Sequence, residues 1–377
     1  SVEKNDVVPM TIRLTNDGQE DGPTMKIETL LPLGKLDPGV RAADKPMDIG
    51  TIGVAAREVE ALGYDGLVVE ETKEDPYVVI ALAAQATHTL GLATSVALAF
   101  PRSPTVTAMT AWTLQKLSRG RFVLGLGSQV RGHIRRRFGL EYHPPGPWMR
   151  EYVDALRCVW DCWQHGTALD HRGDRYQLNL MVPLFNPGPI DHPIIPIHIA
   201  AVNPYMCRVA GEVADGVRAH PVCTPQYIAE VMWPAVADGA ARRGRDPRQV
   251  AMCMKPLVAT AADEATLAQR IETVRARIAF YASTPGYRAA FEVHGLGDLA
   301  DRLSQYSRAQ RWQEMEKLID NDVLHTYAVV GTYDQIGDLL KARFGKLVTH
   351  LEFSIPVDTN SDRTKLRSLL TELRSIV

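Results

Sequence analysis

The sequence predicts an α/β protein whose parallel strands close into a (β/α)8 TIM barrel with insertions. Eight short apolar runs alternate with stretches of helical periodicity along the chain. The run at residues 90–98 is almost continuously apolar or small, which is typical of a strand buried on both faces of a parallel sheet. A chain of 377 residues is also a common size for one such barrel. A doubly wound open sheet is the alternative, but it requires several strands to be assigned differently.

The elements follow one another without an obvious break in composition. Strands are expected at residues 26–33, 66–69, 90–98, 121–126, 194–201, 214–218, 250–260 and 348–355. Helices are expected at residues 49–62, 77–87, 105–117, 149–164, 205–214, 225–243, 263–281, 332–345 and 361–377. Gly63 is a stop signal for the first helix, and Asn203 followed by Pro204 is a start signal for the helix after the fifth strand. In the helix at 105–117, helical spacing predicts an apolar side formed by Val106, Met109, Trp112 or Thr113, and Leu117.

We expect one domain at residues 25–377, preceded by an N-terminal extension at residues 1–24. The extension is polar and lacks sustained periodicity, so little role in chemistry is expected for it. Two insertions interrupt the alternation, a Pro- and Gly-rich loop region at about residues 132–193 and a mostly helical region at about residues 283–322. The aromatic and apolar residues of the first insertion favour ordered packing over a pocket.

The composition excludes several classes of partner. The net charge is −2 and the isoelectric point is about 6.6, which gives no electrostatic attraction to nucleic acid or to an anionic membrane. No apolar run reaches the ~18 residues that a membrane span needs, and the N-terminus lacks a signal-peptide pattern, so we expect a cytoplasmic protein. The five scattered cysteines do not predict a disulfide framework. Cys158, Cys162 and His165 lack a fourth ligand, so the cysteines are interpreted as buried apolar residues and no metal is expected.

The segment at residues 90–139 contains several short motifs. They are Thr94-Ser95-Val96, F-P-R-S-P at 100–104, W-x-L-Q-x-L-S-x-G-R-F at 112–122, L-G-L-G-S-Q-V at 124–130 and R-R-F-G at 136–139. Gly125 and Gly127 stand where a strand ends, which lets the backbone approach a ligand closely. On these motifs the chain resembles the luciferase-like flavin and deazaflavin oxidoreductases, specifically the branch that uses the deazaflavin coenzyme F420. The resemblance extends from about Met25 to Pro356.

The resemblance implies a cis peptide bond between Ser95 and Val96, in a bulge that supports the back of the cofactor ring. A non-proline cis bond costs about 3–4 kcal/mol, so the residues alone favour an ordinary trans bond. The resemblance also implies that Gly127, Ser128 and Gln129 lie against the ring and its ribityl-like chain, where the hydroxyl and amide groups can form hydrogen bonds.

The resemblance places the phosphate of the cofactor at the end of the fifth strand. Small residues lead there into a helix N-terminus, whose free N–H groups and dipole favour an anion. An ordinary strand-to-helix turn is the alternative interpretation. The residues expected to bind the cofactor in this part are Ala200, Ala201, Val202, Asn203 and Ala219.

Glu71 and Thr72 follow the second strand, and the resemblance implies that they contact the edge of the cofactor. Because side chains alternate along a strand, only one of Glu70 and Glu71 should face the pocket. The best-characterised sugar-phosphate and alcohol dehydrogenases of the family have a histidine base in place of Thr72 and a glutamate proton donor in place of Val130. These departures favour a reductase or an oxygenase whose proton comes from another residue.

His220 is the best remaining candidate for proton transfer, since a strand-end histidine can face the pocket with a pKa near neutrality. A hydrogen-bonded structural histidine is an equal alternative. His220 and Glu71 are therefore the candidate catalytic residues. The four arginines at residues 131–137 are either solvated or bind the acidic oligoglutamate tail of the coenzyme.

Together, these features predict an F420-dependent oxidoreductase that transfers hydride between the coenzyme and a small organic substrate. The alternatives are a two-component FMN monooxygenase, supplied with reduced FMN by a partner reductase, and a non-enzymatic flavin-binding barrel. A homodimer is expected from the family.

Overall fold

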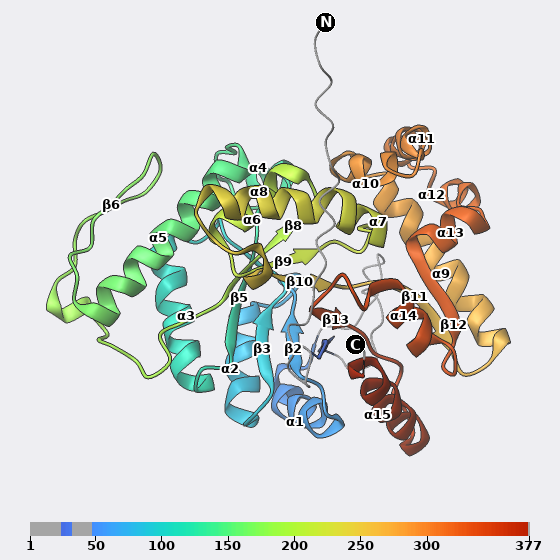
Figure 1. The fold of residues 1–377 in the computed structure, drawn as a ribbon, viewed down its shortest axis with the longest axis horizontal. Coiled ribbons are helices and arrows are strands. Elements are labelled where there is room, and N and C mark those ends of the chain that lie inside the picture. The colour runs from blue at the N-terminus through green and yellow to red at the C-terminus, as the bar shows by residue number, and fades with distance from the viewer. Residues whose placement is uncertain (1–23, 32–46, 376–377) are drawn as a thin grey trace, which may run out of the picture.

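The computed structural model describes residues 24–31 and 47–375 of the chain. Nine parallel strands form one sheet in the order β3-β2-β1-β13-β10-β9-β8-β5-β4, and β3 also pairs with β5. This pairing closes the sheet into a barrel with eight strand positions, because β3 and β4 are two halves of one interrupted strand (Figure 1). The predicted (β/α)8 barrel is confirmed, and the open sheet is excluded. The barrel strands are β1 (Lys26–Leu30), β2 (Gly66–Val69), β3 (Gly91–Thr94), β4 (Ala97–Leu98), β5 (Phe122–Gly127), β8 (Ile197–Ala201), β9 (Gly216–Ala219), β10 (Ala251–Met254) and β13 (His350–Glu352).

Helices surround the barrel, and three of them begin with the same local signal (Figure 1). Asp75, Ser103 and Asn203 each cap a helix with a side-chain oxygen that accepts a backbone N–H, and each is followed by proline. Proline fits the first helical position because its missing N–H has no intrahelical partner there. The helices around the barrel are α1 (Ile52–Leu62), α2 (Pro76–Ala86), α3 (Pro104–Ser118), α5 (Pro145–His165), α6 (Pro204–Val213), α8 (Trp233–Arg242), α9 (Glu264–Ala282), α14 (Ile336–Phe344) and α15 (Asn360–Arg374).

The main hydrophobic core lies between the sheet and these helices, and a small apolar cluster lies inside the barrel. The inner cluster consists of Leu30, Val68 and Ala93, with Val123 packed against it. Elsewhere the interior contains polar and charged side chains, among them Glu28, Arg218 and His198. The interior is therefore apolar beside β2 and β3 and polar elsewhere, which matters for the site described below.

The apolar side predicted for α3 is wrong for most of its residues. Val106 and Met109 are 52% and 57% exposed, and Thr113 and Leu117 are exposed as well. The buried side instead includes Trp112 and the polar residue Gln115, whose amide donates to the carbonyl of Ile194 and accepts the N–H of Phe122. Apolar spacing could not find this face because hydrogen bonds to other segments bury polar groups on it.

The strand predicted at residues 250–260 is divided into β10 and β11 (Leu257–Ala261), with Lys255 and Pro256 between them. Proline cannot donate to a strand ladder, and the chain leaves the barrel at this point. β11 pairs in parallel with β12 (Ala328–Thr332), a strand that the sequence analysis missed. This two-stranded sheet anchors the helical insertion, shown in orange beside the barrel in Figure 1. The insertion contains α10 (Arg288–Glu292), α11 (Gly297–Arg308), α12 (Trp312–Met315) and α13 (Asn321–Tyr327).

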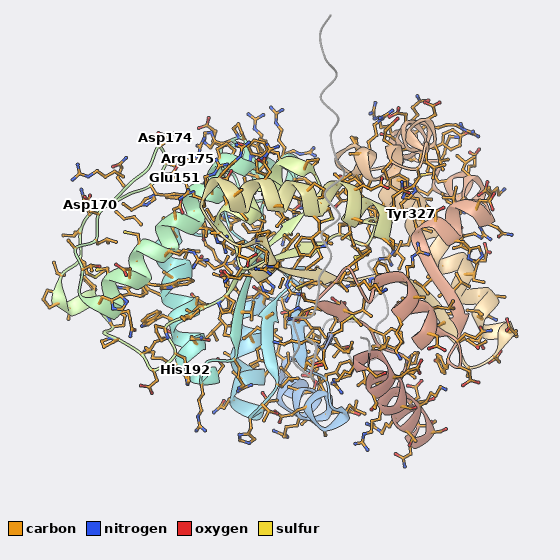
Figure 2. All side chains as sticks on the ribbon, in the orientation of Figure 1. Glu151, Asp170, Asp174, Arg175, His192 and Tyr327 are labelled. Carbon is orange, nitrogen blue, oxygen red and sulfur yellow. The ribbon has the colours of Figure 1, made fainter. Side chains whose placement is uncertain are left out.

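The other insertion forms a long arm on the opposite side of the barrel (Figure 1). The basic segment at residues 131–137 begins with a short helix, α4 (Arg131–Arg136). The arm carries a hairpin of β6 (His171–Arg172) and β7 (Gln177–Leu178). Glu151 on α5 holds the hairpin by accepting the N–H groups of Arg175 and Tyr176 at 2.8 and 2.7 Å. Figure 2 labels Glu151 on α5 and Arg175 on this arm.

Several expectations fall on residues outside the described ranges. The N-terminal extension at residues 1–23, the end of the strand expected at 26–33 and the last two residues of the closing helix are among them. No helix in the described ranges combines the length and the apolar character that a membrane span requires.

Candidate functional site

The residues predicted to bind the cofactor lie at the carboxyl ends of strands that neighbour one another around the barrel. The strands are β2, the β3–β4 pair, β5, β8 and β9, and each pairs with the next. We call this part of the barrel mouth the cofactor arc; it carries Glu71, Thr72, Ser95, Val96, Gly127, Ser128, Gln129, Ala200, Ala201, Val202, Asn203, Ala219 and His220. Barrel enzymes place their ligands at this end. Closure of the barrel therefore brings residues that are far apart in the sequence into one continuous arc.

The third barrel strand is interrupted at Ser95 and Val96, and the peptide bond between them is cis, as predicted. The N–H of Ser95 donates to the carbonyl of Val69 at 2.7 Å, so the segment stays attached to β2. The hydroxyl of Ser95 accepts a hydrogen bond from Nη1 of Arg218 at 3.3 Å. Arg218 comes from β9 on the other side of the barrel, so this contact crosses the interior.

Gly125 and Gly127 make room for the interrupted strand. A Cβ atom at Gly127 would lie 2.5 Å from Cγ2 of Val96, and one at Gly125 would overlap the carbonyl oxygen of Thr94. Real Cβ atoms do not approach other atoms so closely. The sequence analysis expected these glycines to admit a ligand, but the structure shows that the neighbouring strand already requires them.

The end of β5 turns sharply at Gln129. This residue has a φ of 53°, in the left-handed region that non-glycine residues rarely adopt. Its side-chain oxygen accepts the N–H of Val130 at 2.8 Å, which stabilises the turn. Ser128, next to it, is half-buried. Contact of Ser128 and Gln129 with a cofactor stays a prediction.

The end of β8 leads into the N-terminus of α6, as predicted. The side chain of Asn203 accepts the N–H of Met206 at 2.9 Å, and the carbonyl of Val202 accepts the hydroxyl of Tyr227 at 2.9 Å. One N–H of the first turn is thereby satisfied, whereas an α-helix leaves four without an intrahelical partner. Ala200, which is Cα partner to Arg218, lies before this turn. The chemistry of this end suits an anion.

Glu71 is held in an ion pair at the rim of the cofactor arc. Its Oε2 accepts the N–H of Leu98 at 2.7 Å and Nη1 of Arg102 at 2.8 Å, and Arg102 also contacts Asp75 at 3.0 Å. The carboxylate therefore connects the end of β2 with the loop after β4. Thr72 is exposed, and its carbonyl accepts Nη2 of Arg137 at 3.5 Å. The expected cofactor contacts of Glu71 and Thr72 stay predictions.

His220 lies at the end of β9 under Tyr281, at the end of α9, and Tyr287, at the start of the helical insertion. Its ring centroid is 4.6 Å from that of Tyr281 and 4.1 Å from that of Tyr287, and its Nδ1 accepts the N–H of Val222 at 3.3 Å. Burial, aided by the positive charge of Lys255, lowers the pKa of His220 to about 3. The expected pKa near neutrality is therefore wrong, because the insertion covers the imidazole and the neutral form persists at physiological pH.

The remaining strands of the mouth carry charged residues, and we call them the charged arc. It comprises β1, β10 and β13, which lie side by side in the sheet. Glu28 on β1 forms a two-pronged ion pair with Arg218, with Nη1–Oε2 and Nη2–Oε1 distances of 3.0 and 3.3 Å. Lys255, just after β10, contacts Glu70 at 2.8 Å and Glu352 on β13 at 3.1 Å. Glu70 rather than Glu71 thus reaches across the barrel.

Burial raises the pKa of both Glu28 and Glu352, but their charged neighbours shift the two pKa values in opposite directions overall. Burial alone would raise the pKa of Glu28, but the adjacent Arg218 outweighs it and holds that pKa below the ordinary value. For Glu352, burial dominates over the contact with Lys255 and, with help from Glu70 and Glu28, raises the pKa to about 7. Two glutamates inside one barrel therefore differ in their protonation near neutral pH.

The sequence analysis missed Glu28, Arg218, Lys255 and Glu352 as site residues. Each stands within or directly beside an apolar strand, where a charged side chain is rarely buried unless it is paired. That placement was the available signal. The pairing itself could not be found, because the partners are between 97 and 190 positions apart.

No group of three or more His, Cys, Asp or Glu side chains in the described ranges is placed to hold a metal ion. The five cysteines are free thiols, and all except Cys158 are buried.

The donor set of the cofactor arc fits a planar, phosphate-bearing group. Backbone and small side chains line the arc at Ser95, Gly127 and Ala200, and the N-terminus of α6 adjoins them. Nε of Arg218 is buried below the arc and has no hydrogen-bond partner. An unpaired buried donor of this kind suits a ligand that supplies acceptors. The fold and this mouth define a (β/α)8-barrel protein with a ligand site at the carboxyl ends of its strands.

Comparison with known proteins specifies the family. Residues 26–350 match the family model described as luciferase-like monooxygenase, and the chain belongs to this family. The family resemblance drawn from the motifs at residues 90–139 is thereby confirmed.

Two curated relatives and one solved structure illustrate the match. The chain is 39% identical to the uncharacterized protein Rv1360 of Mycobacterium tuberculosis, over 87% of this chain and 96% of that protein. It is 27% identical to the putative coenzyme F420-dependent oxidoreductase Rv3520c of the same species, over 82% and 91% of the two chains. The coenzyme F420 dependent tetrahydromethanopterin reductase from Methanopyrus kandleri shares the fold, with a TM-score of 0.70, 19% identity and coverage of 95% and 99%.

Proposed function

We propose that this protein is an F420-dependent oxidoreductase that transfers hydride between the coenzyme and an organic substrate. Its membership of the luciferase-like family supports an oxidoreductase or monooxygenase, and a relative named for coenzyme F420 supports the deazaflavin. The observation that carries the proposal is the cofactor arc, where an interrupted strand, a glycine, two alanines and a helix N-terminus follow one another on neighbouring strands.

The residues of the arc have distinct parts in this proposal. Ser95, Val96 and Gly127 would support the flat ring, and the N-terminus of α6 would bind the phosphate. The four arginines at residues 131–137, of which Arg137 contacts Thr72, would bind the acidic tail. When bound, the coenzyme supplies a hydride-accepting and hydride-donating carbon. The protein contributes orientation, exclusion of water and proton transfer.

His220 contributes to binding rather than to acid–base chemistry in this proposal. Because Nδ1 accepts a hydrogen bond from Val222, the neutral ring carries its proton on Nε2 and can donate it in a hydrogen bond. A pKa of about 3 keeps the ring in that form. Tyr281 and Tyr287 cover the ring and keep water from it.

The experiment that tests the proposal is a titration of the purified protein with coenzyme F420 and, separately, with FMN. Fluorescence and binding heat report the affinity for each. Micromolar binding of F420 together with much weaker binding of FMN is the expected result. Binding of FMN alone would instead support a monooxygenase that receives reduced FMN from a partner reductase. Binding of neither would contradict both and favour a non-enzymatic barrel.

We also propose that the protein is a homodimer. In support, the adjacent helices α2 and α3 expose Val78, Val106 and Met109, each more than half exposed in the single chain. Apolar groups gathered on one surface commonly mark an interface. Sedimentation of the wild type and of a Met109→Glu variant tests this: the wild type should sediment as a dimer and the variant as a monomer. A monomeric wild type would refute it.

A further inference from the structure

Three side chains meet where the charged arc adjoins the end of β2, and we call them the mouth triad: Glu70 after β2, Lys255 after β10 and Glu352 on β13. Nζ of Lys255 lies 2.8 Å from Oε1 of Glu70 and 3.1 Å from Oε1 of Glu352. The side chains of Glu70, Lys255 and Glu352 are 27%, 15% and 10% exposed. Side-chain exposure therefore decreases from Glu70 through Lys255 to Glu352. The triad thus connects the solvent at the rim with the barrel interior.

The triad adjoins a second ion pair. Glu28 and Glu352 are Cα partners on the neighbouring strands β1 and β13, and Glu28 is paired with Arg218. Among the residues that the structure describes, this cluster contains three carboxyl groups and two cations. Full ionisation of these five groups would leave an excess of one negative charge in a mostly buried cluster, which is costly. Binding of one proton removes that cost.

Geometry decides which carboxyl group takes the proton. Glu28 has two hydrogen bonds to a guanidinium, which favours its charged form, and Glu70 is the most exposed of the three. Glu352 is the most buried member of the triad and has the longer contact with Lys255. The raised pKa of Glu352, about 7, agrees with this ranking.

The groups that face Glu352 come from several elements. Burial raises the pKa of Tyr64 to about 12, so this residue stays neutral. The net charge around Glu352 near neutral pH therefore depends on the carboxylates and cations. The charged and titratable groups around Glu352 are Glu28 on β1, Tyr64 before β2, Glu70 after β2, Arg218 on β9, Lys255 after β10 and, on its own strand, His350.

We propose that the mouth triad is the acid–base group of the site, with one exchangeable proton held at a carboxyl oxygen of Glu352. The proposal deepens the proposed function and rests on it. Reduction of an organic double bond needs one proton for each hydride. The hydride brings both electrons from the reduced coenzyme and forms the new carbon–hydrogen bond. The triad gives its proton to the substrate's heteroatom and is left with two carboxylates around the Lys255 ammonium; water returns the proton.

This assignment supplies the acid–base group that the cofactor arc lacks. Thr72 and Val130 carry no group that titrates near neutral pH, and His220 stays neutral. A group with a pKa near the working pH is the most effective general acid or base. Among the residues discussed above, Glu352 meets that condition. Its triad partners Glu70 and Lys255 follow β2, a strand of the arc, and β10, which pairs with β9 of the arc.

The test uses the full chain without cofactor. Infrared difference spectra between about pH 5 and 9 report the carbonyl band of a protonated carboxyl group. A band that disappears with a midpoint near pH 7 is expected in the wild type and should be absent from Glu352→Gln. The exposed Glu314→Gln is the matched control and should retain the band. Persistence of the band in Glu352→Gln would overturn the proposal.

Two further variants test the coupling within the triad. Glu70→Gln removes a negative charge and should move the midpoint to lower pH, whereas Lys255→Met removes the cation and should move it to higher pH. Thermal melting shows whether each variant is folded, and Glu70→Gln alone suffices if Lys255→Met is not. An unchanged midpoint in folded Glu70→Gln would contradict the proposal.

A binding measurement separates this proposal from the proposed function. Glu352→Gln should bind coenzyme F420 with an affinity within about threefold of the wild type, because Glu352 lies on β13, outside the cofactor arc. The hydride-transfer rate of the variant should fall about 100-fold. Failure of the wild type to bind F420 would refute the proposed function while the infrared titration still stands. Normal F420 binding with no titrating band would refute the triad alone.

Discussion

The two arcs of the barrel mouth lie at the carboxyl ends of different strands of one sheet, and their side chains differ in size and charge. The cofactor arc offers backbone and small residues such as Gly127 and Ala200, whereas the charged arc fills its part of the interior with Glu28, Lys255 and Glu352. A flat ligand needs a surface free of side chains, and proton transfer needs a carboxyl group that is shielded from water. The difference shows how one barrel can separate ligand binding from acid–base chemistry, with Arg218 joining the two arcs.

The largest effect, a loss of folding stability, is expected from replacing Arg218, which contacts residues of both arcs. Arg218→Met deprives the buried Glu28 of its cation and Ser95 of a hydrogen-bond donor, and breaking a buried pair in this way costs about 3–5 kcal/mol. Urea denaturation measures the loss. Arg311→Met, which breaks the exposed pair with Glu314, is the matched control and should cost less than about 1 kcal/mol. Equal losses of unfolding free energy in the two variants would mean that the contacts of Arg218 do not stabilise the fold.

Arg218→Met should also change how the free energy of unfolding depends on pH. The folded-state pKa of Glu28 is lowered, so the pair's contribution is present above its ordinary pKa of 4.5 and is lost as pH falls through the lowered value. The wild type should therefore lose more stability than Arg218→Met when the pH falls from about 5 to 3. Parallel losses in urea denaturation at these pH values would exclude this role for Glu28.

A smaller effect is expected from narrowing the cofactor arc. Gly127→Ala places a methyl group 2.5 Å from Cγ2 of Val96 and must displace the segment that we propose supports the ring. The affinity for coenzyme F420 should fall about 10- to 100-fold, which corresponds to about 1.4–2.7 kcal/mol. Gly286→Ala is the control, because a Cβ there meets no atom within 4 Å. Unchanged affinity in Gly127→Ala would remove this end of β5 from the site.

His220 should affect stability in acid while leaving the pH dependence of activity near neutrality unchanged. Its folded pKa lies below its ordinary value of 6.5, so its contribution is present above pH 6.5 and is lost as pH falls towards about 3. Between about pH 6.5 and 5 the wild type should lose about 1–2 kcal/mol more than His220→Phe in urea denaturation. A change in the pH–rate profile of His220→Ala near pH 7 would instead restore it as the proton carrier.

The smallest effect is expected at the rim. Glu71→Ala breaks the ion pair with Arg102 and the hydrogen bond to Leu98, which should cost about 1 kcal/mol and lower the affinity for F420 by less than tenfold. Isothermal titration measures the affinity, and Asp75→Ala, which removes only the second contact of Arg102, is the control. Full activity in Glu71→Ala would remove this residue from the site.

The sequence by itself determined the features that depend on neighbouring residues. Apolar strand runs and the start signal at Asn203 and Pro204 predicted the barrel and most of its elements. The family resemblance drawn from the motifs at residues 90–139 implied the cis bond at Ser95 that interrupts the third strand. These features can be predicted from neighbouring residues because strand burial, capping and turn geometry act over a few residues.

Only the tertiary structure decided which distant residues meet. The buried face of α3 depends on Gln115 reaching other segments, and β12 depends on its pairing with β11. The low pKa of His220 depends on Tyr281 and Tyr287, which cover its ring. The mouth triad depends on the register of β2, β1, β13 and β10 in the closed barrel. Burial and charge pairing act through space, so their energies are set by closure of the barrel rather than by spacing along the chain.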